Sequence, residues 1–156
     1  MKKTITICCL LVAFSSKAQN TTETEVKGVV EAFFNAFHQG DTIKLKQTMG
    51  DNVTFQTAFR NKEGQDILKQ DDVAGFIKVI GSKRPVLEKW EERISSYNVQ
   101  VDGNMANAWT TYEFWLDGKF SHCGVNSFQL FHDNGIWKII YLIDTRRRAG
   151  CTSYKG

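Results

Sequence analysis

The sequence predicts an α+β domain in which N-terminal helices pack against a strongly curved antiparallel sheet and enclose one pocket. Two observations lead to this prediction. Before residue 81, most apolar residues recur every three or four positions, as in helices that bury one face. From Val86 onward the apolar period becomes two, and Asp-Gly or Asn-Gly pairs divide the chain into strand-length runs. Helices followed by a hairpin meander place the helices together on one face of the sheet.

The first helix is predicted to begin at Thr22 and to end at Gly40. Thr22 and Glu25 have the spacing of a capping box, in which each side chain satisfies a backbone N–H of the first turn. Gly40 ends the helix because glycine adopts the left-handed conformation without steric cost. The apolar face consists of Val26, Val29, Val30, Phe33, Phe34 and Phe37.

Two shorter helices are predicted from aspartates that can serve as N-caps. One begins after Asp41 and is closed by Gly50, and the other begins after Asp71 or Asp72 and is ended by Gly81. Their apolar residues are Ile43, Leu45 and Met49 in the second helix and Val73, Phe76, Ile77 and Ile80 in the third.

The strands are predicted from β-branched and aromatic residues in alternation with polar ones. Turns at Asp102-Gly103, Asp117-Gly118 and Asn134-Gly135 separate the last four, because these pairs favour the turns that match the twist of paired strands. The predicted ranges are 53–59, 86–101, 105–116, 119–132 and 136–148.

The first 18 residues have the pattern of a secretory signal peptide. Lys2 and Lys3 precede a run of apolar residues and threonine at 5–14, which is too short to span a bilayer, and Ser16 and Ala18 provide small residues before a cleavage site. A buried first helix is the alternative, although the run has no polar face. We therefore expect export to the periplasm or the outside of the cell, with cleavage near Ala18 and one domain at 19–156. No later stretch is long and apolar enough to span a membrane.

The charge of the chain argues against nucleic-acid binding. The full sequence has 20 Lys and Arg against 17 Asp and Glu, but three of the lysines and none of the acids lie in residues 1–18. The remaining domain is therefore formally neutral and lacks the basic surface of a nucleic-acid binder. The short basic run 146–148 is interpreted as a solvated strand end.

No cofactor is expected. The three histidines and the two cysteines of the mature chain are scattered and lack the spacing of metal ligands. No glycine loop precedes a helix in a phosphate-binding arrangement, and there is no Gly-x-Ser-x-Gly sequence.

Cys123 and Cys151 either form a disulfide or remain two separate thiols. An exported protein meets an oxidising compartment, which favours the bond. Bonded cysteines need Cα atoms within about 7 Å of each other. Because Cys151 follows the last predicted strand and Cys123 lies within a strand, the chain would have to fold back after Gly150 to form the bond.

Two-residue turns fix the strand register, and the register fixes which side chains share a face. Tight turns at 117–118 and 134–135 place Glu113 opposite His122, Trp109 opposite Asn126, and Tyr141 opposite Phe128. We expect the helices to cover the face that carries the following residues: Trp109, Thr111, Glu113, Trp115, Phe120, His122, Asn126, Phe128, Leu130, Trp137, Ile139, Tyr141, Ile143, Thr145 and Arg147. The opposite face mixes apolar and polar residues and could be solvated or could form a homodimer.

The candidate catalytic pair on the covered face is Glu113 and His122. An imidazole held by a carboxylate is a general base near neutral pH, although a satisfied ion pair is the alternative interpretation. Asn126 and Tyr141 could donate hydrogen bonds to a developing oxyanion. The predicted ligand-binding residues are Trp109, Trp115, Asn126, Tyr141 and Phe34, with core filling as the alternative for the aromatic ones; Trp137 is assigned to the core.

The chain resembles a nuclear-transport-factor-2-like (NTF2-like) domain, and within that superfamily the SnoaL-like branch. The segments that carry the resemblance are 101–106, 112–114, 117–118, 122–124, 128–130 and 134–139, together with the opening helix pair around Gly40-Asp41. The resemblance covers about residues 22–148 and implies a cystatin-like cone: a bent sheet wrapped around a long helix, with a pocket at the open end.

Members of this superfamily include polyketide cyclases, ketosteroid isomerase, scytalone dehydratase and limonene epoxide hydrolase, and also transport and scaffold proteins without catalysis. The resemblance implies an aspartate or histidine general base deep in the cone of the enzymes. Glu113 and His122 occupy about that place, whereas Asp41 matches a helix start and Asp144 is expected on the other face. No acidic residue therefore matches a known catalytic one.

Three functions follow from these observations. The first is an exported small-molecule-binding domain of SnoaL-like type that binds a small apolar ligand and has no assignable reaction. The second is an isomerase, dehydratase or cyclase that performs general acid–base chemistry on a small apolar substrate. The third is a dimerising, non-catalytic interaction module whose cone is filled. Fold alone does not choose among them.

Overall fold

The structure is a computed structural model that describes residues 6–82 and 89–151, with side chains described from Thr22 onward. The side chains of the predicted signal peptide, and the first residues of the strand predicted at 86–101, lie outside the described part. Among the described residues, no helix is both long and apolar enough to cross a membrane.

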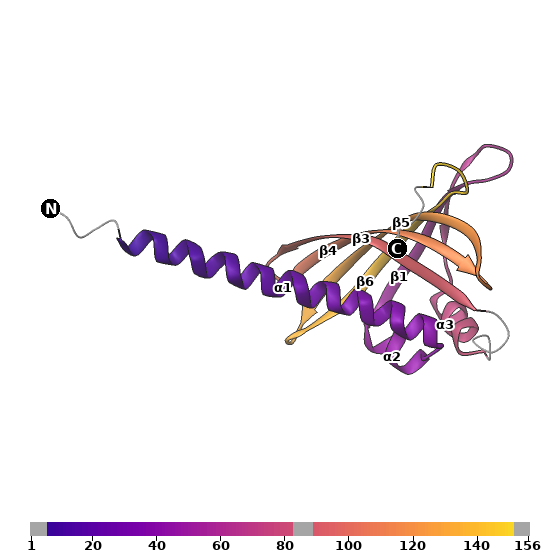
Figure 1. Ribbon diagram of the computed structural model, residues 1–156. Coiled ribbons are helices and arrows are strands. Elements are labelled where there is room, and N and C mark those ends of the chain that lie inside the picture. The colour runs from indigo at the N-terminus through magenta and orange to yellow at the C-terminus, as the bar shows by residue number, and fades with distance from the viewer. Residues whose placement is uncertain (1–5, 83–88, 152–156) are drawn as a thin grey trace.

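In the described part of the chain, three helices accompany one six-stranded sheet that curves around the first helix (Figure 1). The strand order across the sheet is β2-β1-β6-β5-β4-β3. All neighbouring pairs are antiparallel except β1 and β6, which run parallel, so the expected antiparallel sheet contains one parallel pair. The elements are α1 (Thr6–Gln39), α2 (Thr42–Gln47), β1 (Met49–Arg60), β2 (Asp66–Gln70), α3 (Val73–Gly81), β3 (Trp90–Asp102), β4 (Met105–Leu116), β5 (Lys119–Asp133) and β6 (Ile136–Arg146).

Helix α1 is longer than predicted. It begins at Thr6 and continues through the capping-box residues Thr22 and Glu25, so the predicted start at Thr22 is wrong for the full chain. A capping box stabilises a helix start only where the preceding residues are not helical. The N-terminal part of α1 extends beyond the sheet, and its C-terminal part lies in the concavity of the sheet (Figure 1). Gly40, with φ of 69°, ends the helix as expected.

The short helices begin where the sequence predicts. Asp41 caps α2 and accepts a hydrogen bond from the backbone N–H of Lys44 at 3.0 Å, and Asp72 caps α3. Helix α2 ends at Gln47, however, and Met49 begins β1, so the predicted extension to Gly50 is wrong. The sequence prediction also missed β2, which pairs with the edge of β1 after a turn at 61–65.

Strands β4, β5 and β6 begin where predicted, and their tight turns form at Asp117-Gly118 and Asn134-Gly135. All four turn residues have positive φ, as the favoured hairpin turns require. The β3–β4 turn lies one residue later than predicted, because Asp102 pairs with Met105 and the loop is Gly103-Asn104.

Two β-bulges change the register that the turns at 117–118 and 134–135 set, and a third, at Ser95, shifts the pairing of β3 with β4. β4 and β5 pair from Leu116↔Lys119 to Trp115↔Phe120, and then an extra residue in β5, Ser121, moves the pairing to Phe114↔His122. Ile140 is the corresponding extra residue in β6. A shift of one residue moves side chains to the opposite face relative to their neighbours. The predicted pairings therefore hold at the turns and fail beyond the bulges.

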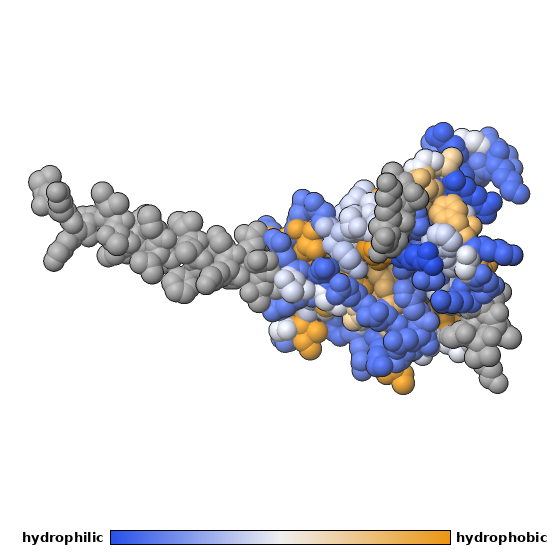
Figure 2. Space-filling model, viewed as in Figure 1, coloured by the Kyte–Doolittle hydropathy of each residue, from blue (hydrophilic) through white to orange (hydrophobic). Residues whose placement is uncertain are grey.

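The core fills the narrow part of the cone between α1 and the concave face, by which we mean the face of the sheet that packs against α1. Several of its side chains have no exposed surface. The buried residues that form this part of the core include Val26, Val30, Phe33, Ala108, Phe128, Leu130, Trp137 and Ile139. The surface seen in Figure 2 is mostly hydrophilic, with separate hydrophobic patches.

Candidate functional site

A cavity of about 510 Å³ lies in the wide part of the cone, between α1, α3 and the concave face. Cavities of a few hundred Å³ with apolar walls and a few polar groups are typical of small-molecule sites. The aromatic part of the wall consists of Phe33, Phe34, Phe37, Phe55, Phe76, Trp90 and Phe114. The polar side chains toward the sheet are those of Glu92, Tyr112, His122, Asn126, Asp144 and Arg146, and Lys69, Asp71 and Asp72 line the cavity from β2 and the start of α3.

The structure does not bring Glu113 and His122 together. Glu113 is opposite Cys123, and His122 is opposite Phe114, because of the bulge at Ser121. Successive side chains of a strand point to opposite faces, so Glu113 points to the convex face while its neighbours in β4 line the cavity. The predicted Glu113–His122 pairing is therefore wrong.

The other predicted site residues divide between the two faces in the same way. His122, Asn126 and Phe34 line the cavity. Trp109, Trp115 and Tyr141 are not part of its wall; Trp109 is about half exposed, and the hydroxyl of Tyr141 donates a hydrogen bond to Gln56. Tyr141 lies beyond the bulge at Ile140, which explains why the turn-based register placed it wrongly.

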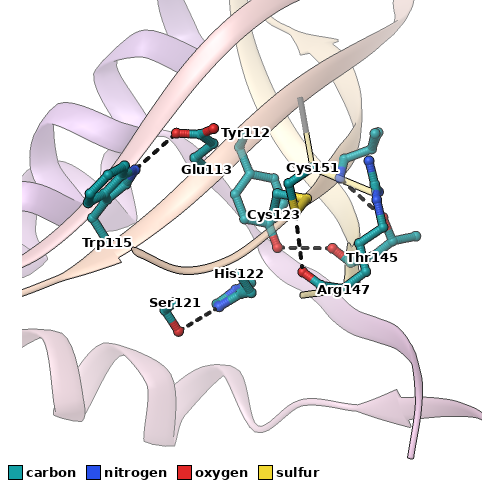
Figure 3. The surroundings of a disulfide bond; sticks show 10 residues. Tyr112, Glu113, Trp115, Ser121, His122, Cys123, Thr145, Arg147 and Cys151 are labelled. Carbon is teal, nitrogen blue, oxygen red and sulfur yellow. Dashed lines mark hydrogen bonds between the residues drawn. A yellow bond between two sulfur atoms is a disulfide. The ribbon is translucent and has the colours of Figure 1, made fainter. Parts of the chain in front are cut away.

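Glu113 belongs to a cluster on the convex face. The indole Nε1 of Trp115 donates a hydrogen bond to Glu113 Oε2 at 3.1 Å (Figure 3). The guanidinium of Arg93 stacks over the Trp115 ring, 4.2 Å from its centre. Cation–π contacts of this kind stabilise a strand pair without forming a site.

Glu92 is the acid that the structure places in the cavity. It is opposite Phe114 across β3 and β4, and its Oε1 accepts a hydrogen bond of 2.7 Å from Asn126 Nδ2. The same Nδ2 also donates to Thr110 Oγ1 at 3.3 Å, which fixes the amide. Burial raises the pKa of Glu92 to about 8, against the effect of the Asn126 hydrogen bond and with a further contribution from the negative charge of Asp144. The Glu92 carboxyl is therefore mostly neutral at pH 7.

A second polar group centres on Asp144 at the end of β6. Its carboxylate accepts hydrogen bonds from Thr57 Oγ1 at 2.6 Å, from the Tyr112 hydroxyl at 3.1 Å and from Arg146 Nε at 2.6 Å. Burial and the nearby Asp144 raise the pKa of Tyr112 well above its usual range, so the phenol stays protonated. Asp71 Oδ2 lies 2.9 Å from the same Thr57 hydroxyl and shares its hydrogen, which connects this group to the rim of the cavity.

His122 contributes a neutral imidazole to the cavity wall. Its ring stacks on Phe114 with centres 5.0 Å apart. Figure 3 shows the contact of its Nδ1 with Ser121 Oγ, at 3.1 Å. Burial and, to a smaller extent, the positive charge of Arg146 lower the pKa of His122 to about 4, against the effect of the negative Asp144. A neutral imidazole can donate or accept a hydrogen bond, but it does not balance the charge of an acid.

The structure contains a disulfide between Cys123 and Cys151, with Cα atoms 5.9 Å apart (Figure 3). The chain folds back after β6, with Gly150 at a φ of 68°. Cys123 and Arg147 exchange two backbone hydrogen bonds of 2.9 Å, which extends the β5–β6 pairing to the bond. The disulfide lies on the convex side, behind the strand that carries His122.

Sequence reasoning missed Glu92, Tyr112, Asp144 and Arg146. Glu92 follows another glutamate, and the residue types alone do not indicate which of the two faces inward. Asp144 and Tyr112 were assigned to the outer face by the turn-based register, and Arg146 was read as part of a solvated basic run. Alternation from Trp90, an aromatic residue that begins β3, could have indicated Glu92.

In the part of the chain that the structure describes, no three His, Cys, Asp or Glu side chains come together as metal ligands. The cavity residues are instead suited to a small organic molecule. The neutral Glu92 carboxyl, the Asn126 amide, the His122 imidazole and the Tyr112 phenol can all form hydrogen bonds, and the aromatic wall can enclose an apolar body.

No protein-family model matches the chain, and no curated protein sequence matches it. Solved structures do match. An NTF2-like protein with a cystatin-like fold from Novosphingobium aromaticivorans has a TM-score of 0.64 at 12% identity, covering 93% of this chain and 94% of that one. A candidate dehydratase of the NTF2-like family from Streptomyces avermitilis has a TM-score of 0.64 at 13% identity, covering 83% and 99%.

A third similar structure is the β subunit of a candidate aromatic-ring-hydroxylating dioxygenase from Novosphingobium aromaticivorans. Its TM-score is 0.65 at 12% identity, and the match covers 85% of this chain and 94% of that one. These likenesses show that the chain has the NTF2-like, cystatin-like fold, and they confirm the predicted cone at the level of the fold. At such low identity they do not assign a reaction or ligand.

Proposed function

We propose that this protein binds a small organic molecule with an apolar, partly aromatic body and a polar group that hydrogen-bonds to the sheet side of the cavity. The observation that carries the proposal is the open cavity of about 510 Å³, with seven Phe and Trp side chains in its wall and polar groups at its sheet side. An open cavity also argues against an interaction module whose cone is filled.

Native mass spectrometry of the protein purified from its native source tests this proposal. The expected result is a co-purifying small molecule that is lost in the variant Leu142→Trp, because Leu142 lines the cavity and the indole would fill part of it. The matched control is Ile140→Trp, which places the same bulk in the same strand at an exposed position. Equal retention of the molecule by both variants would place the ligand elsewhere.

Proton-transfer catalysis on such a ligand is a second candidate function, favoured by the presence of Glu92 and His122 in one cavity. A carboxyl with a pKa of about 8 can give and take a proton near neutral pH. The test is deuterium exchange at the C2 position of 1-tetralone in D₂O. Catalysed exchange that is lost in Glu92→Gln supports an isomerase-type or dehydratase-type reaction; unchanged exchange in that variant leaves binding as the function.

We also propose that the chain belongs to the SnoaL-like branch and is exported after cleavage near Ala18. The basic start, the apolar run and the small residues at the cleavage site support export, and the 134–139 segment supports the branch. N-terminal sequencing of the protein from the cell envelope or medium tests the cleavage. A mature N-terminus at Gln19 is the expected result, and an intact Met1 in the cytoplasm would contradict it.

A homodimer through the convex face is a further part of this proposal. Exposed apolar side chains on or next to that face support it, among them Trp109, Phe131 and Ile140. Light scattering during size exclusion should give twice the monomer mass, and Trp109→Glu should reduce it to the monomer mass. A monomeric wild type at micromolar concentration would contradict the dimer.

A further inference from the structure

We propose that the cavity selects a neutral ligand with an acceptor oxygen, such as a ketone, and that Glu92 recognises this oxygen by donating a hydrogen bond from its acid form. This inference rests on the proposed binding function and names the ligand class. It also names Glu92 as the residue that excludes carboxylates from the cavity.

The geometry around Glu92 leaves one oxygen for a ligand. Oε1 accepts the hydrogen bond from Asn126, whose Nδ2 is also bonded to Thr110. Among the residues that the structure describes, Oε2 has no hydrogen-bond partner, and no Lys, Arg or His forms an ion pair with Glu92. A protonated carboxyl whose first oxygen accepts from an amide presents its O–H from the second. Because Glu92 lines the cavity, that O–H is available to a bound molecule.

The nearby cation does not neutralise Glu92. Arg146 donates to Asp144 from Nε and to both Asp144 and Thr57 from a terminal nitrogen, so its charge is directed at Asp144. Lys69 pairs with Asp71 at 2.8 Å on the rim. The titratable groups that face Glu92 from the surrounding elements are His38 of α1, Tyr97 of β3, Tyr112 of β4, His122 of β5, and Asp144 and Arg146 of β6.

Burial keeps the acid form of Glu92 at neutral pH, although the Asn126 hydrogen bond and Arg146 favour the carboxylate. Burial disfavours the carboxylate, Asp144 adds to the effect, and the pKa of Glu92 is about 8. The pKa values of both His38 and His122 are lowered, chiefly by burial, so neither imidazole supplies a compensating charge at pH 7. A ligand carboxylate would be buried near the negative Asp144 without an unpaired cation to balance its charge. A ketone oxygen carries no charge and can accept a hydrogen bond from the Glu92 O–H directly.

Four probes of the same shape and different polar groups test the selectivity: tetralin, 1-tetralone, 1-aminotetralin and 1,2,3,4-tetrahydro-1-naphthoic acid. Isothermal titration calorimetry at pH 7 should rank 1-tetralone above tetralin and the carboxylate last. Since 1-tetralone does not titrate, its affinity should fall about tenfold from pH 7 to pH 9, as an acid of pKa about 8 ionises.

Two glutamine variants identify the residue. Glu92→Gln keeps a neutral donor of the same shape, so 1-tetralone should bind at pH 7 and the affinity should not fall at pH 9. Glu91→Gln is the matched control, because Glu91 neighbours Glu92 in the same strand and hydrogen-bonds to Arg93 instead. It should retain the tenfold fall of the wild type.

The outcomes separate this inference from the proposed function. Equal affinities for tetralin and 1-tetralone, or tightest binding of the amine or the carboxylate, would overturn the selectivity and leave an apolar binding cavity. A ketone affinity that falls in Glu92→Gln as in the wild type would overturn the role of Glu92. The absence of any probe binding, together with a native protein free of ligand, would overturn the proposed function and this inference with it.

A measurement without ligand covers the case in which Glu92→Gln does not fold. The side-chain carboxyl ¹³C resonance of Glu92 in the wild type should titrate with a midpoint near pH 8. A midpoint near the ordinary value of a glutamate, about 4.3, would overturn the proposal.

Discussion

Glu91 and Glu92 are consecutive residues of β3, and their carboxyls lie on opposite faces of the sheet. Glu91 accepts two hydrogen bonds from Arg93, at 3.0 and 3.2 Å, and these hold its pKa below the usual range. Glu92 faces the cavity without a paired cation, and burial raises its pKa to about 8. Two glutamates of one strand thus differ in charge: Glu91 is a surface anion on the convex face, and Glu92 is a neutral acid on the concave face.

The difference extends to the neighbouring strands. On the convex face, the Trp115 indole contacts the guanidinium of Arg93 and donates a hydrogen bond to the buried carboxylate of Glu113. On the concave face, Tyr112 and Asp144 form a network that crosses from β4 to β6. We infer that the presence or absence of a paired cation, rather than the residue type, distinguishes the charged Glu91 from the neutral Glu92. The predictions below test that separation in order of decreasing effect.

The largest effect is expected at Gly124, where neighbouring backbone and the Tyr112 ring leave no room for a side chain. A Cβ at this position would lie 1.7 Å from the carbonyl oxygen of Thr145 and 2.8 Å from the Tyr112 ring. Gly124→Val should therefore lower the free energy of unfolding in urea by about 4 kcal/mol, because backbone must move and Tyr112 loses its contact with Asp144.

Gly28→Ala is the control for Gly124. Gly28 lies in α1, and a Cβ there meets nothing within 4 Å. Alanine favours the helix by about 1 kcal/mol over glycine, so this variant should be more stable than the wild type. If Gly124→Val loses less than about 1 kcal/mol, the close packing of the concave face is not a constraint.

The disulfide on the convex side should give the second largest effect. It closes a loop with a sequence separation of 28, for which chain-entropy estimates give about 3 kcal/mol. Cys151→Ala should lower the free energy of unfolding by about this amount, measured against the wild type with and without reductant. Reduction should not change Cys151→Ala. A wild type equally stable in both conditions would contradict a stabilising bond.

The pH dependence of stability should distinguish Glu92 from Glu91. The folded pKa of Glu92, about 8, exceeds the ordinary value, so its stabilising contribution is complete below about pH 4.3 and is lost as the pH rises to 8. Glu92→Gln should therefore gain about 2 kcal/mol relative to the wild type between pH 5 and pH 8.5 in urea unfolding, about half of the full linkage, because the carboxyl opens onto the cavity and is only partly buried.

The matched variant Glu91→Gln should behave in the opposite way. Because the folded pKa of Glu91 is lowered, its contribution is present above the ordinary glutamate pKa and is lost as the pH falls through the folded value. This variant should be less stable than the wild type at pH 7, and the difference should shrink as the pH falls below the ordinary pKa of a glutamate. Parallel stability curves for the two variants would remove the distinction between the faces.

The sequence predicted the fold class well because its signals are local. Apolar spacing located the C-terminal part of α1 and the three last strands, and Asp41 and Asp72 capped the short helices as expected. β2 was missed because its residues are mostly exposed and polar, so its position depends on pairing with β1.

The candidate site was predicted less well because it depends on two residues that no pattern marks. Ser121 and Ile140 are the extra residues of two bulges, and each shifts the register beyond a correctly predicted turn. The sequence placed His122, Asn126 and Phe34 in the cavity correctly. It also placed Glu113 and Tyr141 there, whereas the acid and the tyrosine that line the cavity are Glu92 and Tyr112. A bulge adds one residue to a strand and does not require Gly or Pro, so no residue type in the sequence shows where the faces change.

The smallest effect is expected at His122, the concave-face neighbour of the disulfide cysteine. Burial lowers its folded pKa to about 4, below the ordinary value of about 6.5. Its contribution is therefore present above pH 6.5 and is lost as the pH falls toward 4, because the unfolded chain binds a proton that the folded one does not. Between pH 7 and pH 5 the wild type should lose about 1 kcal/mol more than His122→Gln in urea unfolding, since partial exposure reduces the full linkage.

His132→Gln is the control for this measurement, because His132 lies near the β5–β6 turn beside Trp137, outside the cavity wall. It should follow the wild type between pH 7 and pH 5. If His122→Gln also follows the wild type, then His122 is solvated rather than enclosed between Phe114 and Tyr112. Water would then reach the cavity wall that His122 shares with Glu92. The concave face would still differ from the convex face in geometry, but it would not shift the pKa values of its side chains by burial.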